Sequence, residues 1–134
     1  MNIKTALSYK ISVISMTLAG FSLSACTIDG EQAQQDAFET CRHDYIEHYE
    51  GLDSLAQWLN RACKAGVNHG LERIENLYEN TPNDVVKVWR RSSRSDCRHD
   101  YDPNDSSLSR MELEACFAGV DALELAIRKQ RSEL

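Results

Sequence analysis

The pentapeptide Cys41-Arg42-His43-Asp44-Tyr45 recurs unchanged as Cys97-Arg98-His99-Asp100-Tyr101. Downstream of each copy lies a second repeated motif. It reads Ala62-Cys63-Lys64-Ala65-Gly66-Val67 in the first instance and Ala115-Cys116-Phe117-Ala118-Gly119-Val120 in the second. The motifs keep their order, and one short gap between them brings the copies into register. Matched motifs in the same order predict an internal duplication, with units at about residues 31–80 and 82–131.

Each predicted unit has the pattern of a helical hairpin. Apolar residues recur at intervals of three and four, which places them on one face of an α-helix. The clearest stripe consists of Leu55, Leu59, Cys63, Val67, Leu71, Ile74 and Tyr78. Gly51, Pro82 and the segment 102–106 interrupt the periodicity and mark turns. Because no segment convincingly alternates apolar and polar residues, the sequence predicts an all-α four-helix bundle made of two tandem helical hairpins.

Four cysteines lie in these helices, and four cysteines allow three disulfide pairings. In an antiparallel hairpin, residues equidistant from the turn lie at the same height. The midpoint of Cys41 and Cys63 falls in the turn at residues 51–53, and that of Cys97 and Cys116 falls at the end of the turn at 102–107. The spacing therefore predicts that each hairpin carries its own disulfide, joining Cys41 to Cys63 and Cys97 to Cys116.

The N-terminus has the layout of a secretory signal peptide, with Lys4 and Lys10 beside an apolar run at residues 11–24. The run ends in Leu23-Ser24-Ala25-Cys26, which resembles the lipobox of bacterial lipoproteins. The resemblance implies cleavage before Cys26, attachment of a diacylglyceryl group to its thiol, and acylation of the new amino terminus by a fatty acid such as palmitate. Because Thr27 follows rather than Asp, it also implies sorting to the outer membrane, facing the periplasm.

These features divide the chain into a signal peptide at residues 1–25, a lipidated cysteine with a short tether at 26–30, and a periplasmic helical domain at 31–134. The chain has a formal net charge of −6, and removal of the signal peptide would take away basic residues but no acidic ones. Nucleic-acid binding depends on neutralising phosphates with basic side chains. We therefore expect membrane attachment through the lipid and a periplasmic or outer-membrane protein as partner, with no nucleic acid.

The repeated Arg-His-Asp trio raises the question of a catalytic or metal site. Successive side chains on a helix point about 100° apart, so the three residues of one copy cannot converge on one atom. A metal would require the two copies to face each other through His43 and His99, and we predict no metal and no cofactor. The trio is interpreted as structural, through capping or a buried ion pair, with a binding surface as the alternative.

Basic residues form a stripe in the third predicted helix: Lys87, Arg91, Arg94 and Arg98. The preceding helix carries a matching acidic stripe: Glu72, Glu75 and Glu79. If the two helices form a hairpin centred near Asn83, three of these pairs lie level, which predicts an interhelical charge ladder. Arg90 and Arg98 fall outside the ladder. They remain candidates for partner binding, together with His43 and His99.

No motif for a reaction is recognisable in the helical domain. The segment that starts at Asp100 begins like a calcium loop, but Asp105 and Met111 occupy positions where such a loop has Gly and Glu. We therefore predict a non-enzymatic binding or assembly factor, an adaptor for an envelope protein. The alternative is a periplasmic immunity or inhibitor protein, whose acidity would suit the basic cleft of a toxin or hydrolase.

Overall fold

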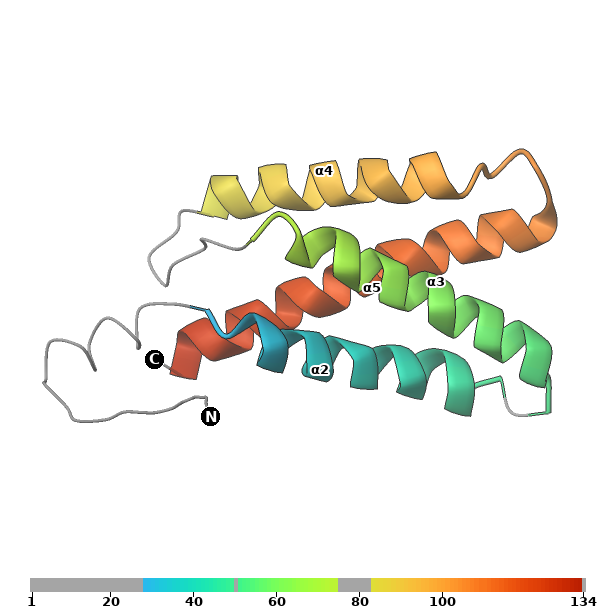
Figure 1. Ribbon diagram of the computed structural model, residues 1–134, viewed down its shortest axis with the longest axis horizontal. Coiled ribbons are helices and arrows are strands. Elements are labelled where there is room, and N and C mark those ends of the chain that lie inside the picture. The colour runs from blue at the N-terminus through green and yellow to red at the C-terminus, as the bar shows by residue number, and fades with distance from the viewer. Residues whose placement is uncertain (1–27, 50, 75–82, 134) are drawn as a thin grey trace, which may run out of the picture.

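The computed structural model describes residues 28–49, 51–74 and 83–133, and most of these residues are helical. Helix α2 (Gly30–Cys41) continues directly into the π-helical segment η1 (Arg42–Glu47). Three further helices follow, α3 (Asp53–Leu71), α4 (Asn83–Asp100) and α5 (Ser107–Glu133) (Figure 1). No strand occurs within the described ranges, so the predicted all-α class is confirmed. None of the described helices is long and apolar enough to cross a membrane.

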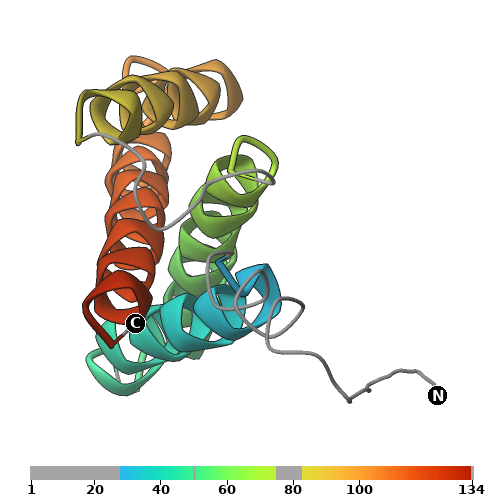
Figure 2. The same cartoon turned by 90° about the vertical axis from the view of Figure 1, so that its left-hand side faces the viewer.

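The bundle is built around a central pair of helices, α3 and α5, which run in the same direction (Figure 1). Helix α2 packs against both members of the pair from one side, and α4 packs against both from the opposite side (Figure 2). The two outer helices do not contact each other. Both hairpin turns lie at one end of the bundle, and the beginning of α2 and the end of α5 lie at the other (Figure 1).

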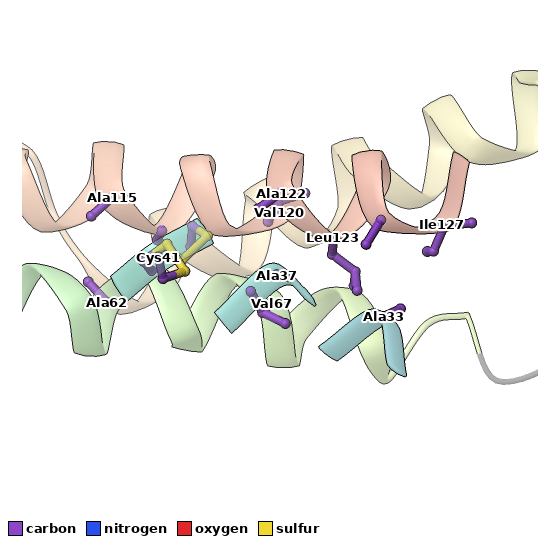
Figure 3. Packing of buried hydrophobic residues seen from close by; sticks show 14 of the residues in the cluster. Ala33, Ala37, Cys41, Ala62, Val67, Ala115, Val120, Ala122, Leu123 and Ile127 are labelled. Atoms are coloured by element: carbon purple, nitrogen blue, oxygen red, sulfur yellow. A yellow bond between two sulfur atoms is a disulfide. The ribbon is translucent and has the colours of Figure 1, made fainter. Parts of the chain in front are cut away.

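The central helices cross at two glycines. A Cβ atom on Gly66 would lie 1.9 Å from the carbonyl oxygen of Cys116, and a Cβ atom on Gly119 would lie 1.9 Å from that of Cys63. Only glycine permits so close an approach of two backbones. Small side chains fill the surrounding core (Figure 3), among them Ala33, Ala37, Ala62, Val67, Ala115 and Val120.

Disulfides join Cys41 to Cys63 and Cys97 to Cys116, with Cα atoms 5.8 Å apart in both. These are the pairs that equal heights across each hairpin predict. All four cysteines are buried. Each bridge therefore links an outer helix to a central helix inside the core, where it reinforces the packing of α2 on α3 and of α4 on α5.

Helix α3 ends earlier than the apolar stripe predicts. The stripe extends to Tyr78, which lies outside the described residues, but α3 ends at Leu71. The indole of Trp89 on α4 donates a 2.7 Å hydrogen bond to the carbonyl of Gly70. That carbonyl also accepts from the Arg73 amide, while the Ile74 amide turns to Leu71. A side chain from another helix thus occupies an acceptor that a further α-helical turn would use.

Candidate partner-binding surfaces

The first Arg-His-Asp copy lies on η1, where all three side chains are exposed. The Arg42 guanidinium forms ion pairs with Glu39 and Glu47. The imidazole of His43 lies 3.2 Å from the carboxylate of Asp44. The hydrogen bond from Arg42 to Glu39 lowers the pKa of that carboxyl group. This copy is therefore largely occupied by local pairs, which hold its charges on the helix surface.

The second copy has different surroundings, so the two copies do not combine into one site. His99 is exposed near the end of α4, on the side of the bundle away from α2. Because η1 contacts α2 and α3 but not α4, His43 and His99 do not face each other. In the part of the chain that the structure describes, no group of three or more histidine, cysteine or acidic side chains is placed to hold a metal ion.

Arg90 forms an ion pair within the bundle and is therefore a weaker candidate for partner binding. Its guanidinium donates a 2.9 Å hydrogen bond to Glu124 on α5, whose side chain is only 10% exposed. Arg128 binds the other oxygen of the same carboxylate from the next turn of α5. A nearly buried carboxylate requires such partners. Of the two predicted docking arginines, Arg90 is thus committed to an interhelical triad.

Arg98 is exposed and has no carboxylate partner among the described residues. Its guanidinium lies 5.1 Å from the centre of the Phe117 ring, and that of Arg94 lies 4.9 Å from the same ring. A cation this close to an aromatic ring gains roughly 0.5–1 kcal/mol at an exposed site. The ring therefore positions Arg98 without neutralising its charge.

The described part of the predicted charge ladder is wrong. Arg94 pairs with Asp121 on α5 at 2.9 Å, and not with Glu72. The physical reason is the orientation of α4, which turns Arg94 toward α5 and away from α3. The other two rungs involve Glu75 and Glu79, which lie outside the described residues.

A polar cluster that the sequence interpretation missed joins α3 to α4 with the opposite polarity. Arg73 forms a bidentate pair with Asp96, with N–O distances of 2.9–3.1 Å. His69 lies 2.7 Å from Asp100 through Nε2. Arg73 with Asp96 and His69 with Asp100 are each equidistant in sequence from the same turn position. Equal distance from the turn, the criterion that predicted the ladder, is therefore also met by these two pairs. The predicted ladder considered only acidic residues of the first helix and basic residues of the second, whereas these pairs have the reverse arrangement.

Among the described residues, one face of α4 has no ion-pair partner after these pairs are formed. This basic face consists of five exposed residues: Lys87, Val88, Arg91, Ser95 and Arg98. No carboxylate within the described ranges forms an ion pair with its three cations. Val88 is 57% exposed.

Two tyrosines close the hairpins at the turn end of the bundle. Tyr45 and Tyr101 each stand four residues after the first cysteine of their motif, and both pack against the core. Burial raises the pKa of each phenol, and nearby carboxylates add to the effect, with Asp44 near Tyr45 and Glu112 near Tyr101. These matched environments belong to the packing of the fold.

Comparison of the chain with protein-family models, with curated proteins and with solved structures gave no match. Cys26, the predicted lipidation site, lies outside the described residues. The class of protein therefore rests on the bundle, its surfaces and the lipobox resemblance.

Proposed function

We propose that the protein is a lipoprotein of the bacterial outer membrane, and that its periplasmic helical domain binds an envelope protein as a non-enzymatic adaptor. The lipobox at residues 23–26 supports the anchor. The helical bundle, with a basic face that has no ion pair within the described ranges, supports the binding role. Nothing in the proposal requires a cofactor.

The observation that carries the proposal is the attachment of Asp29, at the start of the domain, to Gln130 on α5. The Asp29 amide donates to Gln130 Oε1, and Gln130 Nε2 donates to the Asp29 carbonyl, both at 2.9 Å. Asp29 follows Cys26 by three positions, a span of about 10 Å when fully extended. An acylated Cys26 would thus hold this end of the bundle next to the bilayer. A domain tethered so closely is suited to receive a partner at a fixed distance from the membrane.

We also infer that the domain arose by duplication of one helical hairpin. The reciprocal contacts of Gly66 and Gly119 support this history, because each glycine meets the cysteine of the other motif copy. A two-fold rotation along the bundle would exchange α2 with α4 and α3 with α5 (Figure 2). The cysteines of the first hairpin are 22 positions apart and those of the second are 19 apart. The extra residues lie in η1, because this segment continues to Glu47, six residues after Cys41, whereas α4 ends at Asp100, three residues after Cys97.

A cation–π pair with exchanged roles supports the same inference. In the first unit the ring belongs to Phe38 on α2 and the cation to Lys64 on α3, with Nζ 5.2 Å from the ring centre. In the second unit the cation is Arg94 on α4 and the ring is Phe117 on α5. The four residues occupy equivalent positions of the two motif frames. The contact is thus present in both units although neither residue type is retained.

The second candidate is an immunity or inhibitor protein, which the net charge of −6 favours because an acidic surface suits a basic active-site cleft. The exposed basic face of α4 favours the adaptor, since it would repel such a cleft.

Affinity purification of the tagged, full-length protein from crosslinked bacterial envelopes tests the proposal, with Cys26→Ser as the unanchored control. The adaptor role is expected to give one envelope protein in stoichiometric amount with the wild type and less with the control. Recovery of a hydrolase or toxin that is inactive in the complex would favour the inhibitor. Recovery of the wild-type protein alone would contradict both.

A further inference from the structure

We infer that the basic face of α4 is the surface through which the protein binds an acidic segment of its partner. This inference rests on the proposed adaptor function and deepens it by assigning the site and the chemistry of the partner. Among the described residues, Arg90 and Arg94, both in the basic region of the sequence, pair with carboxylates of α5, whereas Lys87, Arg91 and Arg98 form no ion pair.

The charged side chains of α4 have different partners on its different sides. On the flank toward α3, the carboxylates Asp96 and Asp100 are paired with Arg73 and His69. On the flank toward α5, Arg90 and Arg94 are paired with Glu124 and Asp121. Both seams are therefore neutralised by partners within the bundle. The outward direction retains Lys87, Arg91 and Arg98.

These three cations follow one another at +4 and +7 positions, so they form a row about 16 Å long at a rise of 1.5 Å per residue. A protein segment with carboxylates on one helical face could lie along this row and meet each cation in turn. Val88 stands beside the row and is 57% exposed. An apolar contact bordered by charges is the usual composition of a protein–protein interface.

The position of α4 favours a protein partner over the lipid surface. The chain enters the domain at Asp29, immediately before α2, and α2 lies on the side of the central pair opposite α4 (Figure 2). With a short tether from Cys26, the start of α2 would be held at the bilayer. The central pair would then separate the basic face of α4 from the start of α2, which favours an acidic protein segment over lipid headgroups as its ligand.

The test uses the full-length, lipidated protein in cells, with a photoreactive amino acid in place of Val88 or, as a matched position, of Leu125. Leu125 is an aliphatic residue on α5 that is 67% exposed. Crosslinking is expected from position 88 and not from position 125, and the attached peptide of the partner is expected to be rich in aspartate and glutamate. Charge reversal at Lys87, Arg91 and Arg98 should reduce the yield at least tenfold.

A matched control reverses three other exposed cations without an ion pair in the described ranges, Arg61, Arg110 and Lys129, which changes the net charge equally. This control should retain the crosslink. A crosslink from position 125 alone, or no crosslink from either position, would overturn the inference but leave the adaptor proposal to the affinity purification. Attachment to lipid or lipopolysaccharide, equal loss in both triple variants, or a lower thermal midpoint of the α4 variant alone would also overturn the inference.

Discussion

Gly66 on α3 faces the backbone carbonyl of Cys116 on α5, and a Cβ atom at position 66 would lie 1.9 Å from that oxygen. The same distance separates a Cβ atom at Gly119 from the carbonyl oxygen of Cys63. Each close approach thus occurs next to one half of a disulfide. The two glycines set the distance between the central helices, and the two disulfides attach the outer helices at the same level.

Replacement of either glycine by alanine is therefore expected to destabilise the domain. The new methyl group would meet backbone, which cannot turn aside, and crowding of a packed interior costs typically 1–3 kcal/mol. We expect Gly66→Ala and Gly119→Ala each to lower the free energy of unfolding by about 3 kcal/mol, as measured by chemical denaturation. Gly30→Ala is the control, since its Cβ would meet only a Leu71 methyl group at 3.8 Å. Similar losses in all three variants would contradict the crossing geometry.

The proposed equivalence of the two hairpins predicts a compensating pair of substitutions. Phe38→Arg or Lys64→Phe alone removes the cation–π contact of the first unit, at a cost of about 0.5–1 kcal/mol. The double variant Phe38→Arg, Lys64→Phe reproduces the arrangement of Arg94 over Phe117 in the second unit. A double-mutant cycle of unfolding free energies should therefore give a favourable coupling of about 1–2 kcal/mol, because the double variant recovers what each single variant loses. Simple additivity of the two single effects would argue against equivalent positions.

The seam between α3 and α4 should depend on Arg73 and Asp96 and not on the ladder predicted from the sequence. Because these side chains are partly exposed, their bidentate pair is expected to contribute no more than about 1 kcal/mol. A cycle with Arg73→Gln and Asp96→Asn should detect this coupling at low salt. The corresponding cycle with Glu72→Gln and Arg94→Gln should detect none. A larger coupling between Glu72 and Arg94 would mean that α4 is rotated relative to this structure.

Stability at alkaline pH should reflect the two half-buried tyrosines. Burial raises the pKa of Tyr45 and of Tyr101 above the value of about 10 in the unfolded chain. The folded state therefore keeps each phenolic proton at a pH where the unfolded chain releases it. This stabilisation is complete below pH about 10 and is lost as the pH rises through the folded pKa. Tyr45→Phe, Tyr101→Phe should flatten the alkaline decline measured by thermal unfolding, and an unchanged profile would refute the assignment.

The sequence was sufficient to predict those features that depend on position along a helix. Apolar periodicity located the helices, and equal distance from a turn paired Cys41 with Cys63 and Cys97 with Cys116 in agreement with the structure. It was not sufficient where the rotation of a helix matters. Two residues can lie at the same height and point in different directions, which is why Arg94 binds Asp121 instead of Glu72.

Contacts between distant residues also escaped prediction because no local pattern encodes them. Trp89 ends α3 by taking the carbonyl of Gly70, a helix-terminating contact supplied by another helix. Arg90 appeared free in the sequence because its partner, Glu124, lies on α5. Of the two arginines predicted to bind a partner, Arg98 alone has no ion pair within the described residues.

The central claim is that Cys26 anchors this bundle to the outer membrane, and mass spectrometry of the mature N-terminal peptide tests it most directly. The protein should be purified in detergent from isolated outer membranes of its own bacterium. The account predicts a peptide that begins at Cys26 and carries a diacylglyceryl group on the thiol and a fatty acid on the amino group. A peptide that begins elsewhere, or a Cys26 with an unmodified thiol, would contradict the account.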